Sequence, residues 1–362
     1  MFSLPSEVQL DVLKCLKFKQ LFSLKQTNFY FYNLIKKYEG ELARMKFCSL
    51  SLIPTLKSVW QKVDSWVFIN FEPVVSDFVL NDHLLEKWGK AIDESIPLFS
   101  YLFEYDFVYD IPVDIPDIAV HMTKQGIVKK GSWLGFKESR FILELPNIPK
   151  TIKEMIIIRY WLKQLFKFAY FENASLEYGI FNPEMINLLF DNDKTILKQF
   201  YVQDIKRLFN DEVTEKFYEF ALNRFAIYGC LEIDLYQDDN ITEKYTDILF
   251  NIIINEGNRV PQVTFVVSKI IRLYDLIIEY ITTSKDLSKM VSTIAFSCYT
   301  GKLNFKLPEN AEYKTCEILI PDIETWKSTY YKIVNIYNPK IKFELSNTEH
   351  DEYSSCVCIK KH

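Results

Sequence analysis

The first 45 residues carry apolar side chains at spacings that suit short, packed helices. Leu4 precedes Pro5, and a residue before proline is disfavoured in the helical conformation. Proline itself suits the first helical position, because the N–H that it lacks is not needed there. A helix is therefore predicted to begin at Pro5, and one stripe of it repeats every fourth residue: Val8, Val12 and Leu16.

Two further helices are predicted to complete this cluster, over residues 19–26 and 28–37. The first helix also carries Leu10 and Leu13 on a second stripe. A unit of about 40 residues cannot bury apolar positions on two sides of one helix. We therefore expect the cluster to expose an apolar face that a partner covers.

Residues 46–195 predict a mixed α/β region. Aromatic, extended-looking runs dominate its first hundred residues, and a helical stretch lies near residues 83–94. Thr151 can cap a long helix that reaches about Phe171. The segment Asn182-Pro183 predicts another helix through Phe190, with asparagine as its cap and proline at its first position.

Residues 196–349 alternate strand-like and helical segments. Strand centres at residues 202, 233, 265 and 295 are separated by 31, 32 and 30 residues. Helices are predicted between strands, among them residues 242–254 and 322–335. Such βα units form either a curved solenoid with a broad binding face or a closed, irregular α/β domain. The last segment, residues 350–362, predicts a polar tail.

Charge and glycine content exclude several classes of function. The net charge of −5 gives no overall attraction to nucleic acid or to an anionic membrane, and neither is expected as a partner. No apolar run reaches the ~18 residues of a membrane span, and no signal peptide is expected. Nine glycines in 362 residues do not form a dinucleotide fingerprint or a phosphate loop.

The sequence also lacks the spacings of common catalytic and metal sites. Four histidines are dispersed, and seven cysteines have no zinc or disulfide spacing, which favours a reducing compartment. We therefore expect no enzyme activity, no cofactor and no metal, and a location in the cytoplasm, the nucleus or both.

The stretch from Leu4 to Ile35 resembles an F-box without a gap. An opening Leu-Pro-x-Glu is followed by an aliphatic helix with a leucine at its end, a leucine pair in the second helix and an aromatic residue near the start of the third. Phe29 and Tyr30 stand where the family usually has basic residues. The remainder is similar, more weakly, to the expanded nematode F-box families.

This resemblance implies a non-catalytic, substrate-recognition subunit of an SCF-type ubiquitin ligase. Residues 1–45 would be the F-box, 46–195 a region leading into the recognition domain, and 196–349 a recognition domain of leucine-rich-repeat-like βα units. The expected fold class is thus α+β or α/β. A Skp-type adaptor, and through it a cullin, would be the partners, with an unknown protein as substrate. The alternative is an adaptor-bound scaffold that acts independently of ubiquitination.

The residues expected to bind the adaptor come from the first two helices. Leu4, Pro5 and Val8 crowd the start of the first helix and are the clearest partner contacts. The remaining candidates serve either as contacts or as internal core of the cluster. The full set is Leu4, Pro5, Val8, Val12, Leu13, Leu16, Leu21 and Leu24.

Overall fold

The computed structural model describes the chain as two compact units. The first unit comprises Met1–Val202 with Asn223–Phe225, and the second comprises Gln203–Leu222 with Ala226–His362. The described residues are 4–54, 66–69, 80–101, 118–130, 133–176, 178–208, 214–235, 243–269, 271–299, 301–305, 312–320, 323–350 and 354–362.

The elements up to β7 and α7 belong to the first unit, and three later ones, β8, α8 and β9, have residues in both. In chain order they are α1 (Ser6–Lys14), α2 (Phe18–Lys25), α3 (Phe29–Lys37), η1 (Glu39–Glu41), β1 (Met45–Pro54), β2 (Trp66–Phe68), α5 (Asp82–Asp93), β3 (Phe99–Tyr101), β4 (Ile118–Lys130), β5 (Trp133–Glu144), α6 (Ile152–Phe168), β6 (Ala169–Ser175), β7 (Gly179–Phe181), α7 (Pro183–Leu189), β8 (Phe200–Leu208), α8 (Thr214–Arg224) and β9 (Phe225–Ile227).

The remaining elements belong to the second unit. They are β10 (Cys230–Asp234), α9 (Glu243–Asn255), β11 (Gln262–Val266), α10 (Arg272–Thr283), β12 (Thr293–Cys298), β13 (Glu312–Ile320), β14 (Ile323–Val334), β15 (Lys342–His350) and β16 (Ser354–Lys361).

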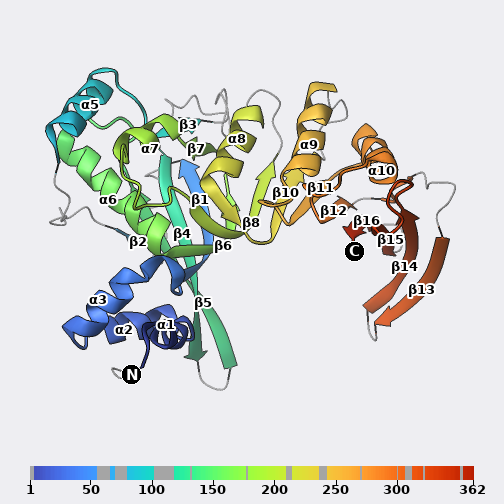
Figure 1. Ribbon diagram of the computed structural model, residues 1–362, viewed down its shortest axis with the longest axis horizontal. Coiled ribbons are helices and arrows are strands. Elements are labelled where there is room, and N and C mark those ends of the chain that lie inside the picture. The colour runs from blue at the N-terminus through green and yellow to red at the C-terminus, as the bar shows by residue number, and fades with distance from the viewer. Residues whose placement is uncertain are drawn as a thin grey trace. The chain divides into compact units, whose positions relative to one another are not determined.

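The three N-terminal helices confirm the predicted cluster. Pro5 is the N-cap of α1, so the helix begins one residue later than predicted, and the Asn28 side chain caps α3 by accepting from the Phe31 amide at 3.0 Å. The small core consists of Leu13, Leu21, Ile35 and Leu42. Figure 1 shows α1, α2 and α3 gathered beside the strands of the same unit.

Five strands form the sheet of the first unit in the order β6-β1-β4-β5-β2. β1 is parallel to β6 and antiparallel to β4, β4 is antiparallel to β5, and β5 is parallel to β2. β3 and β7 make a separate antiparallel pair. The mixed α/β architecture predicted for this part of the chain is confirmed.

Helix α6 begins where the sequence predicted. The Thr151 hydroxyl accepts from the Glu154 amide at 3.2 Å, and the Glu154 carboxylate accepts from the Thr151 amide at 3.1 Å, which is a capping box. Asn182 likewise caps α7, with Pro183 as its first residue. Both helix starts are therefore confirmed, and α6 ends three residues before the predicted Phe171.

A tight turn after α7 packs against helix α6 of the first unit. Asn192 has a φ of 58°, a left-handed conformation that asparagine tolerates. On one side of it, Asp193 accepts from the Arg159 guanidinium of α6 at 2.6 Å. Arg159 is only 5% exposed, donates to the Leu189 carbonyl and lies 4.6 Å from the Phe190 ring centroid.

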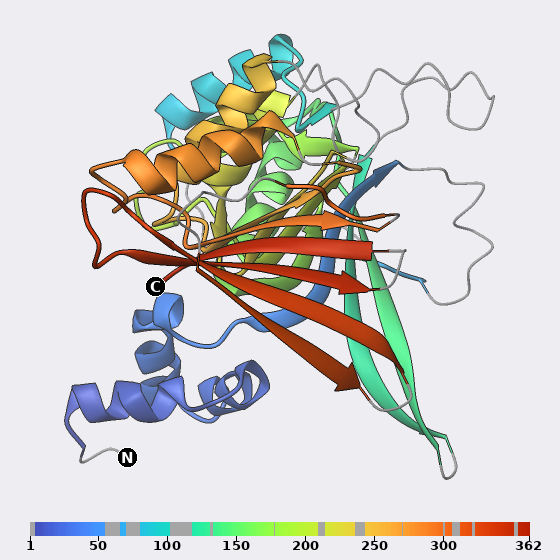
Figure 2. The same cartoon turned by 90° about the vertical axis from the view of Figure 1, so that its right-hand side faces the viewer.

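The second unit begins with parallel strands. β8, β10, β11 and β12 are neighbours in that order, and each adjacent pair is parallel. This confirms the predicted βα succession for these four strands, because parallel neighbours need a crossover connection. Figure 2 shows α9 and α10 on one side of the strands of their unit.

The last part of the second unit differs from the prediction. Residues 322–335 were predicted to be a helix, but residues 323–334 form β14, which pairs antiparallel with β13 and β15. The segment is rich in threonine, tyrosine and β-branched residues, which favour strands. The succession of βα units thus ends at β12, and antiparallel strands follow it.

The prediction of a polar tail over residues 350–362 is wrong. Residues 354–361 form β16, which lies between β12 and β15 and is antiparallel to both. Ser355, Val357 and Ile359 are buried, and the residues between them are half-buried. This alternation is the pattern of a strand with one covered face.

Asp193 gives the first unit a pH-dependent contribution to stability. Burial raises its pKa, but hydrogen bonds from Thr195 and the charge of Arg159 outweigh burial, so the pKa lies below the ordinary 3.8. A carboxyl group with a lowered pKa in the folded state stabilises the fold above its unfolded pKa. That stability is lost as the pH falls through the folded pKa.

We predict that Asp193→Asn lowers the free energy of unfolding by about 2 kcal/mol at neutral pH, because it removes the charge that faces a buried guanidinium. The difference from the wild type should be constant from about pH 5 to 7 and should shrink below about pH 4. Urea unfolding measured across this range checks it, with the exposed Asp93→Asn as control. A difference that does not change with pH would contradict the role of the charge.

Candidate functional site

The start of α1 is held in place by one glutamine. Gln9 is only 5% exposed, and its side-chain amide donates to the Leu4 carbonyl at 2.7 Å. The Tyr30 hydroxyl of α3 donates to the Gln9 side-chain oxygen at 2.5 Å. These two bonds fix the segment before α1 against the helix and against α3, so Leu4 and Pro5 have a defined position.

The structure divides the eight predicted contact residues into three groups. Leu13 and Leu21 are buried in the core of the helical cluster, and Leu16 and Leu24 pack against that core while partly exposed. The remaining four are exposed and form what we call the α1 stripe: Leu4, Pro5, Val8 and Val12.

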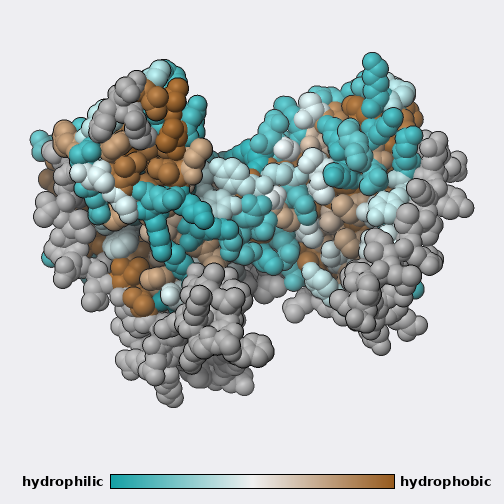
Figure 3. All heavy atoms as spheres, turned by 90° about the horizontal axis from the view of Figure 1, so that it is seen from below, coloured by the Kyte–Doolittle hydropathy of each residue, from teal (hydrophilic) through white to brown (hydrophobic). Residues whose placement is uncertain are grey.

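The α1 stripe follows from helical geometry. Leu4, Val8 and Val12 are four residues apart and are 38%, 41% and 40% exposed, whereas Leu13 on the opposite side has no exposed area. One face of the helix therefore builds the core, and the other is open to a partner. In the view from below, hydrophobic residues gather at the upper left, over the N-terminal helices (Figure 3).

Four exposed aromatic residues extend the apolar surface of the cluster, and none is among the eight predicted contacts. They are Phe22, Phe29, Tyr30 and Tyr32, of which Phe29 is 76% exposed. The rings of Phe29 and Tyr32 stack with centroids 6.1 Å apart. For the three residues of α3, the run of aromatic residues at its start was the signal available in the sequence, because residues on all sides of a short helix cannot all face one core.

Lysines lie beside this aromatic surface. The Lys25 and Lys36 ammonium groups are 5.3 and 5.7 Å from the Tyr32 ring centroid. On the other side of the cluster, Lys14 pairs with Glu41 at 2.9 Å, and the hydrogen bond from that pair raises the pKa of Lys14. The α1 stripe and the exposed aromatic residues thus form an apolar surface with a partly basic margin.

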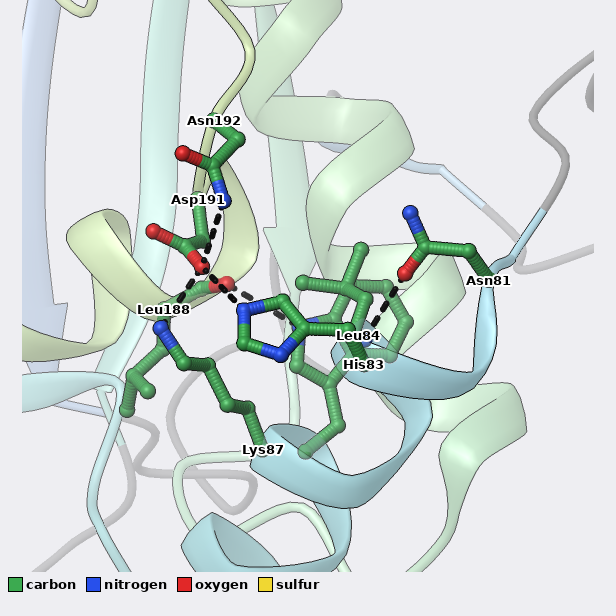
Figure 4. Close-up of polar contacts among 8 residues, drawn as sticks. Asn81, His83, Leu84, Lys87, Leu188, Asp191 and Asn192 are labelled. Atoms are coloured by element: carbon green, nitrogen blue, oxygen red, sulfur yellow. Dashed lines mark hydrogen bonds and ion pairs between the residues drawn. The ribbon is translucent and has the colours of Figure 1, made fainter.

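A second cluster of polar groups lies between α5 and the turn after α7. Asp191 accepts from Lys87 at 2.7 Å, and His83 lies 3.5 Å from the same carboxylate oxygen (Figure 4). The Trp88 indole of α5 donates to the Leu188 carbonyl at 3.0 Å. The hydrogen bond from Lys87 is the main cause that lowers the pKa of Asp191.

These groups are arranged as a connection between elements. His83 is 59% exposed, and Asp191 also accepts from Lys87 and from the Asn192 side-chain amide (Figure 4). Asn81 caps α5 by accepting from the Leu84 amide at 2.8 Å. The cluster therefore positions α5 against the end of α7.

Metal-binding and membrane-spanning features were sought in the described part of the chain. It contains no group of three or more His, Cys, Asp or Glu side chains arranged to hold a metal ion. Among the helices described, none is long and apolar enough to cross a bilayer. The α1 stripe with its aromatic extension is consequently the candidate functional site.

Comparison with known proteins gives two family matches. Residues 69–236 match a domain of unknown function (DUF8381), which covers the mixed α/β part of the first unit and the start of the second. No curated protein and no solved structure matches the chain. Residues 1–40, which contain α1, α2, α3 and the whole α1 stripe, match the F-box domain, so the chain carries an F-box.

Proposed function

We propose that the protein is the substrate-recognition subunit of an SCF-type ubiquitin ligase. Its F-box docks on a Skp-type adaptor, which connects it to a cullin, and the remainder of the chain presents target proteins. The α1 stripe carries this proposal, because Val8 and Val12 are exposed on one face of a helix whose other face is core, and Leu4, just before the helix, is exposed as well. The proposed location is the cytoplasm, the nucleus or both.

The eight predicted residues take different roles in this proposal. Leu4, Pro5, Val8 and Val12 contact the adaptor directly, and Leu16 and Leu24 contribute through their exposed parts. Leu13 and Leu21 act indirectly, because they hold the three helices together from within the core. The exposed aromatic residues of α3, which lie outside the lining of the cavity beside α2, widen the contact, since aromatic side chains contribute strongly to protein interfaces.

The open face of the parallel strands in the second unit is the surface proposed for target proteins. Along β10, Leu231 and Ile233 are buried, while Glu232 and Asp234 alternate with them and are partly exposed. Glu232 pairs in register with Thr264 of β11, whose side chain is also partly exposed. Side chains held in a row on a rigid sheet can recognise a target protein. This face would therefore take the role that was predicted from the sequence for the surface of a solenoid.

Reconstitution separates a substrate receptor from an adaptor-bound scaffold. The full chain with adaptor, cullin and the ubiquitin-transfer enzymes should modify proteins that proximity labelling enriches, and proteasome inhibition should increase their amount. Labelled partners whose ubiquitination and abundance do not depend on the F-box chain would identify the scaffold and overturn the receptor proposal.

The α1 stripe gives a prediction about adaptor affinity. Val8→Asp should weaken adaptor binding at least about tenfold, because a carboxylate would be buried in an apolar contact without a partner. Isothermal titration calorimetry on the purified full chain measures it. Leu197→Asp, which likewise places a carboxylate at an exposed apolar position but outside the three helices, is the control and should bind as the wild type does. Equal affinities for all three proteins would exclude Val8 from the interface.

A second pair of variants separates contact from folding. Leu13→Ala should destabilise the helical cluster by about 3 kcal/mol, because it leaves a cavity in a core of four buried residues. Val12→Ala, at an exposed position, should cost less than about 1 kcal/mol yet still weaken adaptor binding. Hydrogen exchange of the α1–α3 amides measures the stability. Unchanged adaptor affinity in Val12→Ala would remove Val12 from the contact.

A further inference from the structure

A cavity of about 540 Å³ that is open to solvent on one side lies in the first unit, between the helical cluster and the sheet. Its walls come from α2, from the segment between η1 and β1, from β1, β4 and β5, and from α6. These elements are up to about 150 residues apart in the chain, so only the folded unit creates this space. The volume is within the range of small-molecule sites, about 300–1,000 Å³.

The lining of the cavity is largely apolar and rich in aromatic side chains. Its large side chains are Phe18, Phe22, Phe47, Phe141, Trp161 and Phe168. Edge-to-face contacts support this wall, with Phe18 6.4 Å from Phe168 and Phe47 6.4 Å from Phe141, centroid to centroid. A wall of this composition favours a hydrocarbon chain over a polar ligand.

The charged residues of the lining carry a positive surplus. They are three lysines, Lys25, Lys124 and Lys167, and one carboxylate, Glu39. Glu39 already accepts from Lys25 at 3.1 Å and from Lys167 at 3.4 Å, and these three groups together keep one positive charge. The surplus therefore favours an anionic group on the ligand.

Lys124 is the one lysine of the lining that does not pair with Glu39. Its ammonium group lies 5.7 Å from the Phe47 ring centroid, at the boundary between the charged and the aromatic lining. No carboxylate among the residues that the structure describes lies within ion-pair distance of it. A ligand carboxylate would supply the missing partner, and charge-assisted hydrogen bonds are the stronger kind.

We propose that this cavity binds a long-chain carboxylic acid, with its hydrocarbon chain against the aromatic wall and its carboxylate at Lys124. The site is separate from the α1 stripe and goes beyond the proposed ligase function. Because the ligand touches both α2 and α6, it joins the F-box to the α/β body of the same unit. Binding thereby stabilises the arrangement of these two parts.

Trp161 provides a direct readout of binding, because it lines the cavity. Titration of the full chain with 9,10-dibromostearate, below the concentration at which it forms micelles, should quench tryptophan fluorescence saturably. Trp161→Phe should remove most of the saturable quenching. Oleate should displace the brominated acid, and oleyl alcohol should displace it at least about tenfold less well, because it lacks the charge that Lys124 recognises.

Variants of the lining separate the chain site from the head-group site. Ala43→Trp fills the cavity from an exposed position and should abolish saturable quenching. Lys124→Met keeps the length of the side chain and should raise the dissociation constant about tenfold. Lys153→Met, on an exposed part of α6 outside the lining, is the matched control and should bind as the wild type does.

Four results would overturn the proposal. They are the absence of saturable quenching, quenching that persists in Trp161→Phe, equal binding by the Lys124→Met variant and the wild type, and competition between the adaptor and the acid. The last would show that the cavity belongs to the adaptor interface. Saturable quenching that survives saturation with adaptor would support a separate ligand site whether or not the chain promotes ubiquitination.

Discussion

The buried guanidinium of Arg159 sets the arrangement of the first unit. A charge at 5% exposure is stable only where nearby groups replace the water that it lost. The turn after α7 supplies those groups through Asp193, the Leu189 carbonyl and the Phe190 ring. These contacts hold the end of α7 against α6.

The same turn connects a third helix. Asp191 accepts from Lys87 of α5 two residues before Asp193 accepts from α6, and Asn192 between them takes the left-handed conformation. A single turn thus determines where α5, α6 and α7 meet. Because α6 also forms a wall of the cavity beside the F-box, the position of that wall depends on a contact at the far side of the helix.

Local signals in the sequence were sufficient to predict helix starts and the parallel strands. Pro5, Thr151 and Asn182 act within a few residues of the helices that they begin, so their effect does not depend on tertiary structure. The spacing of about 31 residues between strand centres correctly predicted parallel strands, because two parallel neighbours need a connection as long as a helix.

Features that depend on long-range packing were missed. Residues 323–334 have apolar positions compatible with both helix and strand, and the pairing with β13 and β15 decides between them. Likewise, Val12 and Leu13 look alike in sequence, but the rotation of α1 in its cluster exposes one and buries the other. The cavity had no sequence signal, because its lining comes from segments far apart in the chain.

The position of β16 gives the last residues of the chain an importance that their polarity conceals. This strand separates β12 from β15, and its loss would leave two hydrogen-bonding edges open in the middle of a sheet. A premature stop codon that removes residues 354–362 would therefore do more than shorten the protein. It would expose surfaces on which chains pair with one another, and the truncated product would accumulate as aggregates.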